Sequence, residues 1–297
     1  LDAWRLYAMS LQPLGDATSA RTALQRALAL RPDDGATALD LGTLQLSAGE
    51  IDDALVSLRM AMERLPQEPR AAFRYGTAAF VSGDHAQAAV GFETAARLKP
   101  DWTEAWDNLA AARGKRQDYV AAIAAARNAL QLAPDDASSH QSLSSLQSNL
   151  FDRASLQEGL QHALRALQLD PRLAQAHRDA AILSRKLGDH AGAEAHARHA
   201  FELSPRDIEM IDTLGEQLQL NRKTREAAEV YARAIAAGVE SPALHRQHGI
   251  ALLHDGQVEV ARERLRDALR RAPDDQRPIA HLAVAIAQED AGGASPW

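Results

Sequence analysis

Several histidine and acidic side chains are spaced so that they could bind a metal on one face of a helix. His196 and His199 are three residues apart, Glu202 follows after three more, and His190 lies nearby. Two imidazoles and a carboxylate can bind zinc. Both histidines fall outside the regularly spaced alanines described below, which we expect to be buried. We therefore interpret them as solvated surface side chains and expect no metal site.

The sequence contains no motif that predicts catalysis. It has no G-x-S-x-G nucleophile elbow, no Walker phosphate loop and no H-E-x-x-H zinc motif. Cysteine is absent, which excludes disulfides, thiolate metal sites and a cysteine nucleophile. Acid pairs such as Asp52-Asp53 are interpreted as solvated charges at the start of a helix. We expect neither catalysis nor a bound cofactor in this chain.

Length, composition and charge narrow the class of protein further. A chain of 297 residues exceeds the usual size of a single hydrophobic core, so it contains either several domains or stacked repeats. Aromatic residues make up 4%, and abundant alanine and leucine favour closely packed helices. A formal charge of −7 disfavours nucleic acid as a partner. The longest apolar run, 120–126, is too short to insert into a membrane, so we expect a soluble protein, with a cytoplasmic location favoured.

A period of 34 residues runs along the chain. The stretch LALRPDD at 28–34 returns as LQLAPDD at 130–136 and LRRAPDD at 269–275. With proline at place 32, the period predicts an array over 1–275 with repeats at 1–34, 35–68, 69–102, 103–136, 137–173 (with an insertion), 174–207, 208–241 and 242–275. Residues 276–290 are predicted to form a capping helix or the first helix of a ninth repeat, and 291–297 a linker-like tail.

Three places in the repeat hold small side chains. The eighth place is occupied by Ala8, Gly42, Gly76, Ala110, Ser144, Ala181, Gly215 and Gly249. The twentieth is alanine except for Gly159 in the fifth repeat, and the twenty-seventh is alanine in all eight repeats. Helix backbones can approach closely where side chains are this small. We predict that two helices cross at places 8 and 20, with a second contact to the next repeat at place 27.

Glycine, proline and aspartate mark the predicted helix ends. The first helix is expected to end in the left-handed conformation at Gly15, Gly49, Gly83, Gly188 and Gly256. The prolines at place 32 cannot extend the second helix, and the acids that follow them, as in Asp33-Asp34, favour the start of the next one. Each repeat is therefore predicted to be a helix, a turn and a helix.

This pattern resembles the tetratricopeptide repeat, W-x2-L-G-x2-Y…A-x3-F…A…P, which has the same period. The third repeat matches it closely through Tyr75, Gly76, Ala88, Phe92, Ala95 and Pro100. The match weakens in the fifth repeat, which carries the insertion, and in the seventh, where Val239 replaces proline. The resemblance implies an all-α, right-handed superhelical solenoid of about eight helix-turn-helix repeats plus a C-terminal extra helix.

The resemblance also implies that the open stripe of each first helix lines a concave groove that holds a segment of a partner protein. Places 4, 7, 8 and 11 face the partner helix, which leaves the opposite stripe free. The predicted groove residues are Arg70, Arg74, Thr77, Asp107, Asn108, Gln141, Ser145, Arg178, Asp179, Asp212 and Glu216. The chain is predicted to be a protein–protein interaction scaffold whose peptide or protein partner cannot be named.

Two binding modes known in the family match this groove poorly. A carboxylate clamp would use Arg5, Arg70 and Arg74, but neither of its asparagines is present and Asp40 stands at one of their places. We interpret these arginines as solvated along the groove. An asparagine ladder at the sixth place has Asn108 as its single match.

Four further aromatic and imidazole side chains call for an interpretation. Trp102 and Trp106 are one turn apart at a repeat junction and could form an exposed aromatic platform. Trp106 occupies the place where the family's tryptophan packs, whereas Trp102 could lie in the groove or at its rim. His245 and His248 occupy helix-pairing places and are predicted to be packed core residues.

The two ends of the chain suggest two alternatives. Residue 1 is not methionine and already lies in frame, which suggests a fragment of a longer protein. An alternative function is the N-terminal recognition arm of a larger enzyme, of glycosyltransferase or 2-oxoglutarate and iron hydroxylase type, with its catalytic domain after residue 297. At the other end, Ile279, Leu282, Ala283 and Ile286 are expected at buried places of the last helix. That helix lacks a polar outer face, so self-association is also possible.

Overall fold

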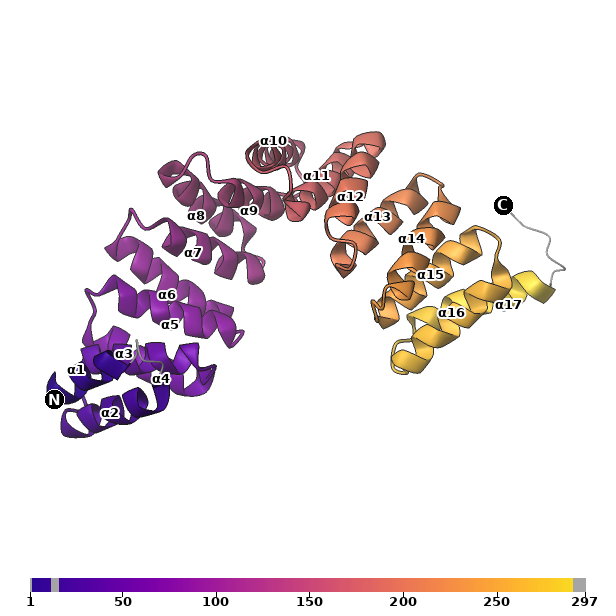
Figure 1. Cartoon of the computed structure of the whole chain (residues 1–297). Coiled ribbons are helices and arrows are strands. Elements are labelled where there is room, and N and C mark those ends of the chain that lie inside the picture. Colours follow the sequence, from indigo (N-terminus) through magenta and orange to yellow (C-terminus); the bar gives the residue numbers. More distant parts are fainter. Residues whose placement is uncertain (1, 12–15, 291–297) are drawn as a thin grey trace. The chain divides into compact units, whose positions relative to one another are not determined.

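The computed structural model describes residues 2–11 and 16–290, which form helices joined by short turns (Figure 1). The helices of these residues are α1 (Asp2–Leu11), α2 (Ala17–Leu30), α3 (Gly35–Ser47), α4 (Ile51–Arg64), α5 (Pro69–Val81), α6 (His85–Leu98), α7 (Thr103–Lys115), α8 (Tyr119–Leu132), α9 (Ala137–Gln147), α10 (Arg153–Leu169), α11 (Ala174–Leu187), α12 (His190–Leu203), α13 (Ile208–Leu220), α14 (Thr224–Ala236), α15 (Pro242–His254), α16 (Val258–Arg271) and α17 (Arg277–Asp290). Eight helix pairs and one last helix make an all-α repeat solenoid. The predicted tail, 291–297, lies outside the described residues. None of the helices described is long and apolar enough to cross a membrane.

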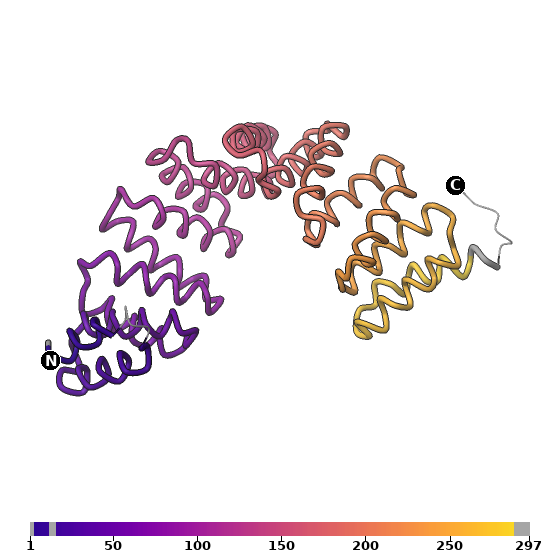
Figure 2. Tube along the Cα trace, in the orientation of Figure 1, coloured from indigo at the N-terminus to yellow at the C-terminus, as the bar shows by residue number. Residues whose placement is uncertain are grey.

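The helices divide into two compact units, a first unit at Leu1–Leu146 and a second unit at Gln147–Trp297. In the first unit, each helix from α3 to α7 contacts the helix before it and the helix after it. In the second unit, α11 to α16 do the same. Figure 2 shows the path of the chain through these successive helices. First helices of consecutive repeats also contact each other, as α3 does with α5 and α11 with α13. Within each unit the first helices therefore share one face.

The small residues at places 8 and 20 lie where paired helices cross, as predicted. A Cβ added to Gly76 of α5 would lie 2.9 Å from the ring of Phe92 and 3.1 Å from the carbonyl oxygen of Ala88 in α6. Across the same crossing, a Cβ added to Gly91 would lie 2.6 Å from the backbone nitrogen of Gly76. A larger side chain would collide with the ring of Phe92 at Gly76 and with backbone at Gly91, so small residues are what allow these helices to pair.

The alanines at place 27 make the second close contact, with the next repeat. All eight are buried. Ala61 packs in one cluster with Ala71 of the following repeat, and Ala95 packs with Ala105 in the same way. The contact between repeats predicted from the spacing is therefore present.

The turn inside the second, third, fourth, sixth, seventh and eighth repeats contains a residue in the left-handed region. Gly49, Gly83, Gly188 and Gly256 adopt it with φ between 78° and 90°, as predicted, whereas Gly15 lies outside the described residues. Gln117 and Arg222 stand at the same place in their repeats and adopt φ of 62° and 60° without being glycine. The turn geometry thus imposes this conformation even where a side chain makes it costly.

The second helices end just before the prolines, and an aspartate caps the next helix at α3, α9 and α13. α2 ends at Leu30, two residues before Pro32, and the backbone N–H of Thr37 donates to Oδ2 of Asp34 at 2.9 Å to cap α3. In the seventh repeat, which lacks the proline, α14 ends at Ala236 and Gly238 takes a φ of 82°. A left-handed glycine replaces proline as the stop signal there.

The expected burial of the last helix, α17, is wrong for three of its four residues. Ile279 and Ile286 are 51% and 47% exposed and Ala283 is exposed as well, whereas Leu282 is partly buried. α17 packs against α15 and α16, with Ala285 fully buried. In the eight complete repeats, the places that these three exposed residues occupy face the second helix of the repeat. The described residues contain no second helix after α17.

Candidate functional site

The first unit contains a hollow where α5 meets the turn between α6 and α7. Its volume is about 350 Å³, and we call it the α5–α7 pocket. It is lined by Glu68, Pro69, Arg70, Phe73, Arg74, Lys99 and Trp102. The carboxylate of Glu68 caps α5 by accepting a hydrogen bond of 3.1 Å from the backbone N–H of Arg70, and Pro69 fits the first turn. The helix then brings Arg70, Phe73 and Arg74 to one face, because residues three and four apart are neighbours.

An aromatic wall closes one side of this pocket. The rings of Phe73 and Trp102 stack with centroids 4.4 Å apart and an angle of 25° between their planes. Phe73 also meets Phe92 edge to face at 5.4 Å. The Trp102 indole N–H donates to the carboxylate of Glu104, and the Lys99 ammonium lies 5.3 Å from the Trp102 ring centroid. These contacts hold both rings in place and make the wall a preformed apolar surface.

The charges of the α5–α7 pocket are not balanced within the chain. Its lining holds three cationic side chains, those of Arg70, Arg74 and Lys99, and one carboxylate. Neither the Arg70 nor the Arg74 guanidinium forms an ion pair or hydrogen bond with another described residue. Elsewhere in the unit Arg5 is paired, with its Nε 2.6 Å from Oδ2 of Asp40. The pocket therefore offers positive charge to an external group although the chain as a whole is acidic.

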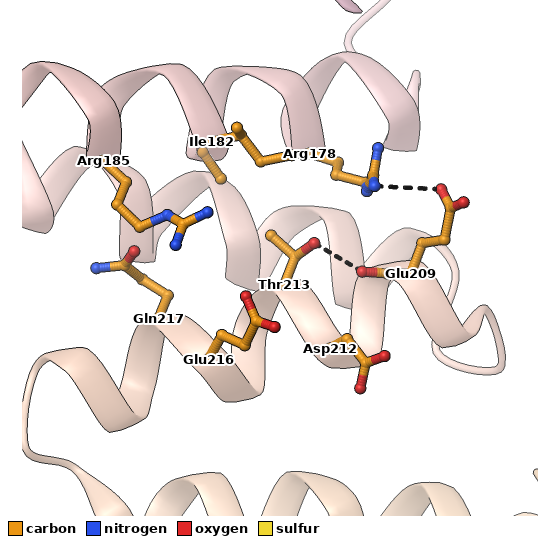
Figure 3. A pocket seen from close by; sticks show the side chains of 9 residues that line it. Arg178, Ile182, Arg185, Glu209, Asp212, Thr213, Glu216 and Gln217 are labelled. Carbon is orange, nitrogen blue, oxygen red and sulfur yellow. Dashed lines mark hydrogen bonds and ion pairs between the residues drawn. The ribbon is translucent and has the colours of Figure 1, made fainter. Parts of the chain in front are cut away.

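The second unit has a hollow of about 280 Å³ between two first helices, which we call the α11–α13 pocket. Figure 3 shows the side chains that line it, and the lining consists of Arg178, Ala181, Ile182, Arg185, Glu209, Asp212, Thr213, Glu216 and Gln217. Nη2 of Arg178 lies 3.5 Å from Oε2 of Glu209, and its Nη1 lies 3.9 Å from Oδ1 of Asp179. Three carboxylates face two guanidinium groups here, and Arg178 is already paired with a carboxylate inside the chain.

Asp212 is the most perturbed carboxyl group of the α11–α13 pocket. Its Oδ1 is buried and has no hydrogen-bond partner among the described residues. Burial raises the pKa of Asp212 to about 6, the negative charge of Glu216 raises it further, and Arg246 opposes the shift. Burial also raises the pKa of Tyr231, and the neighbouring Asp212 adds to that shift. The Asp212 carboxyl therefore changes between its neutral and ionised forms in mildly acidic solution.

Asp107 occupies the corresponding fifth place in the first unit. Burial raises its pKa to about 6, and a hydrogen bond of 3.3 Å from the Ser139 hydroxyl opposes this rise. Its neighbour Asn108 donates to the carbonyl oxygen of Glu104 at 2.7 Å, within its own helix. Asn108 is thus already hydrogen-bonded, which gives no support to the asparagine-ladder mode.

The structure collects part of the predicted groove into the two pockets. Arg70 and Arg74 line one pocket, and Arg178, Asp212 and Glu216 line the other. The remaining predicted residues line neither pocket, and they are Thr77, Asp107, Asn108, Gln141, Ser145 and Asp179.

The expectation for Asp179 is wrong, because its side chain is not open to a partner. Asp179 is 1% exposed and lies beside Arg178. It occupies place 6, between the open place 5 and the buried place 7. Arg74, Asn108 and Thr213 occupy place 6 in other repeats, and their side chains are half-buried. In α11 the side chain at this place, that of Asp179, is fully buried.

Phe73, Lys99, Ile182 and Arg185 line the pockets but were not predicted to do so. Phe73 lies at place 5, directly before Arg74, and an aromatic residue on an otherwise polar stripe was a usable signal. The proposed aromatic platform of Trp102 and Trp106 is replaced by the stacked pair of Trp102 and Phe73. Trp106 packs in the core cluster between the repeats, and its indole N–H donates to the Pro100 carbonyl oxygen at 2.9 Å.

His196, His245 and His248 lie at helix interfaces, whereas His199 is exposed, as expected. Nδ1 of His196 lies 3.1 Å from Nδ1 of His177 in the neighbouring helix, so His196 is half-buried and not the solvated side chain that we expected. Among the described residues no group of three or more histidine, aspartate or glutamate side chains is arranged to hold a metal ion. His245 and His248 are 2% and 6% exposed, which confirms that they are core residues.

Comparisons with known proteins agree with this architecture. Residues 14–72 and 216–276 match models of the tetratricopeptide repeat family. Solved structures similar to the chain include YrrB, described as a tetratricopeptide repeat protein with an unusual peptide-binding site, with 19% identity and a TM-score of 0.55 over 64% of this chain and 96% of that one. The Cut9–Hcn1 hetero-tetramer of the APC/C matches with 14% identity and a TM-score of 0.62, covering 94% of this chain and 54% of that one. MamA from Desulfovibrio magneticus RS-1 matches with 22% identity and a TM-score of 0.53, covering 59% and 98%.

At these identities the similar structures establish the fold and nothing finer. No curated protein sequence matches the chain. The helix pairs, their small-residue crossings and the two family matches identify the chain as a tetratricopeptide repeat protein. Its fold is that of protein-interaction scaffolds.

Proposed function

We propose that the chain binds extended segments of a partner protein along the open face of its first helices. The observation that carries the proposal is the α5–α7 pocket, where Arg70 and Arg74 have no ion pair within the described chain and lie beside a stacked aromatic wall. Exposed charges of this kind add little to stability, whereas arginine and aromatic side chains dominate the affinity of protein interfaces. Recognition is therefore the better explanation for their arrangement.

The α11–α13 pocket is a candidate binding site of the same kind on the first helices of the second unit. It lies between first helices, and it combines the apolar Ile182 with charged groups from both helices. A segment that crosses consecutive first helices of one unit would place one or two side chains in the hollow of that unit. Because rigid helices hold the lining residues, little order has to be gained on binding. The solved structure of YrrB, whose description names a peptide-binding site, supports peptide binding by a protein of this fold.

The proposal is tested by selecting ligands without bias and locating where they bind. A display library of random peptides is panned against the full chain, and each selected peptide is mapped by hydrogen–deuterium exchange. Peptides that bind the proposed face should protect α5, α7, α11 or α13, because ligand binding suppresses local opening of the elements it contacts.

The second helices supply the internal control for this mapping. Protection confined to α6, α12 or α14 would move the binding face away from the first helices. A library that yields no binding peptide after repeated selection would count against peptide binding altogether.

A further inference from the structure

We infer that the α5–α7 pocket selects an acidic segment of the partner protein that carries an aromatic side chain between its carboxylates. The inference rests on the proposed function and specifies the chemistry of the partner at this one site. It follows from three features of the pocket: its unpaired cations, its aromatic wall and the blocked arginine of an earlier repeat.

The unpaired cations determine the charge of the segment. Arg70 and Arg74 are one turn apart on α5, and Lys99 approaches from the end of α6, so three positive charges surround one hollow. Glu68 is committed to the N-terminus of α5 through the backbone N–H of Arg70. A carboxylate entering the hollow gains charge-assisted hydrogen bonds from guanidinium groups that have no partner to give up. An incoming lysine or arginine would be repelled by the same groups.

The aromatic wall determines the side chain between the carboxylates. Phe73 and Trp102 are both half-buried, so each keeps part of its ring surface open. An aromatic side chain inserted against them buries apolar area and adds the ring–ring interaction, and Lys99 lies close enough to contact a ring as well. An aliphatic or polar side chain would lose the ring–ring part of this contact.

The pairing of Arg5 separates this pocket from capture of a carboxyl terminus. A clamp for a terminal carboxylate needs a cation from an earlier repeat, and Arg5 is the residue at that place. Its guanidinium is held 2.6 Å from the carboxylate of Asp40. Arg70 and Arg74 therefore act with Phe73 and Trp102 and not with Arg5. The segment can be internal, and its free carboxyl terminus is not required.

The test uses the full chain and an acetylated, amidated peptide of sequence Asp-Glu-Phe-Glu-Asp, with affinity measured by isothermal titration calorimetry. One comparison peptide replaces Phe with Ala, one reverses every charge to Lys or Arg, and one keeps a free carboxyl terminus. A short single-stranded oligothymidylate serves as a different polyanion. The variant Arg70→Glu/Arg74→Glu reverses the charge of two of the three cations, and Trp102→Leu removes half of the wall.

The control for charge is Arg64→Glu/Arg97→Glu. Both residues are exposed and lie in the same unit, and neither lines the pocket, so the net charge changes equally without a change at the site. The circular dichroism of every variant is compared with that of the wild type first. If Trp102→Leu does not fold, the charge variants still decide the outcome.

The expected result is that the acidic Phe peptide binds, that Arg70→Glu/Arg74→Glu weakens it about tenfold or more, and that the control variant changes it less than about twofold. The Ala peptide should bind several-fold more weakly, and Trp102→Leu should narrow that difference. The amidated peptide and the peptide with a free carboxyl terminus should bind with the same affinity. Raising the salt concentration from roughly 0.05 to 0.3 M should weaken binding of both.

Equal binding of the basic peptide, of the oligothymidylate or of the charge-reversed protein would overturn the inference. A requirement for the free carboxyl terminus would replace it with terminal capture. If panned peptides protect the first helices but the acidic Phe peptide does not bind, the inference fails while the proposed function stands. If no peptide protects those helices, the proposed function itself fails.

Discussion

The α5–α7 and α11–α13 pockets are built on the same repeat but treat their charges differently. In the first, the guanidinium groups of Arg70 and Arg74 have no internal partner and stand beside stacked rings. In the second, Arg178 lies 3.5 Å from Glu209, and an isoleucine takes the place of the aromatic wall. The repeat fixes where side chains can reach the open face. The residue types then determine whether their charges are available to a partner or are neutralised within the chain.

The difference extends to the interior of the two units. Place 7 of the first helix is filled by apolar Leu41 and Leu109 in the first unit, and by the buried Tyr75, whose hydroxyl donates to Gln87 at 3.0 Å. In the second unit the same place holds His248 in the last helix pair, with its Nδ1 buried and without a hydrogen-bond partner in the described chain. A polar group without a partner costs free energy that the first unit avoids at this place.

The largest expected effect comes from overfilling the crossing that supports the α5–α7 pocket. Gly91→Ala places a Cβ 2.6 Å from the backbone nitrogen of Gly76 and 2.8 Å from the carbonyl oxygen of Ala72. Backbone atoms cannot move aside as a side chain can, so α5 and α6 must separate. We expect a loss of about 3 kcal/mol in the free energy of unfolding, measured by urea denaturation.

Gly114→Ala is the matched control in the same unit. Its added Cβ would meet Cδ2 of Leu146 at 2.8 Å, which is the mobile end of a side chain. Alanine also favours the helix over glycine by about 1 kcal/mol, so this variant should be neutral or slightly stabilised. Equal losses in the two variants would show that backbone proximity at the crossing is not what limits side-chain size.

The next effect tests the buried imidazole of the second unit. Burial lowers the pKa of His248 to about 4, with Arg264 and His245 adding to the shift. The unfolded chain takes up a proton near pH 6.5 and the folded chain does so near pH 4. Stability therefore falls as the pH decreases through this window, by about 2 kcal/mol.

His248→Leu installs the side chain that the first unit carries at place 7 and should remove most of that loss. The measurement is the urea midpoint of wild type and variant at pH 7 and pH 4.5. His245, whose pKa is also lowered by burial, leaves a smaller dependence in the variant. Identical pH dependence in both proteins would mean that His248 is not the titrating group.

The sequence predicted the scaffold because the scaffold depends on local sterics. A glycine or alanine at a crossing, a left-handed turn residue and a proline after a helix each constrain the backbone near themselves, so their spacing revealed the helix pairs. Gly76 opposite Ala88, and Asp34 at the start of α3, lie where the period placed them.

The chemistry of the pockets was less predictable because it depends on which rotamers meet between repeats. Phe73 and Trp102 are separated by most of a repeat, and nothing in their local sequence fixes the stacking of their rings. His196 was paired with His199 by spacing along one helix, but it lies against His177 from another. Asp179 lies on a half-open place that neighbouring side chains happen to cover.

A smaller effect is expected at the fifth place of the first helix, where Asp107 in the first unit corresponds to Asp212 in the second. Asp107 accepts a hydrogen bond from Ser139, whereas Oδ1 of Asp212 has no partner among the described residues. The pKa of Asp212 is raised to about 6, so the folded chain binds its proton more tightly than the unfolded chain does. Ionisation above pH 6 therefore costs stability that is retained below about pH 4.

Asp212→Asn should remove this cost. We expect a gain of about 1 kcal/mol at pH 7.5, reduced by solvent screening, and little change at pH 4.5, both measured by thermal unfolding. Glu263→Gln is the control, because that carboxylate is exposed and lies outside the α11–α13 pocket. A gain of the same size at both pH values would assign the effect to packing rather than to the buried charge.

The smallest effect is expected from substitutions that make the α11–α13 pocket more like the α5–α7 pocket. Glu209→Gln/Glu216→Gln removes one of the two carboxylates that pair with Arg178, Asp179 being the other, and leaves Asp212 as the single carboxylate of the pocket lining. We combine this change with Arg70→Glu/Arg74→Glu and measure the affinity for the acidic peptide by calorimetry. The combined variant should bind the peptide about threefold more tightly than Arg70→Glu/Arg74→Glu alone does. Affinity should stay below that of the wild type because Ile182 cannot stack as Trp102 does. If no binding returns, unpaired cations are not sufficient, and the aromatic wall is the feature that makes the α5–α7 pocket a binding site.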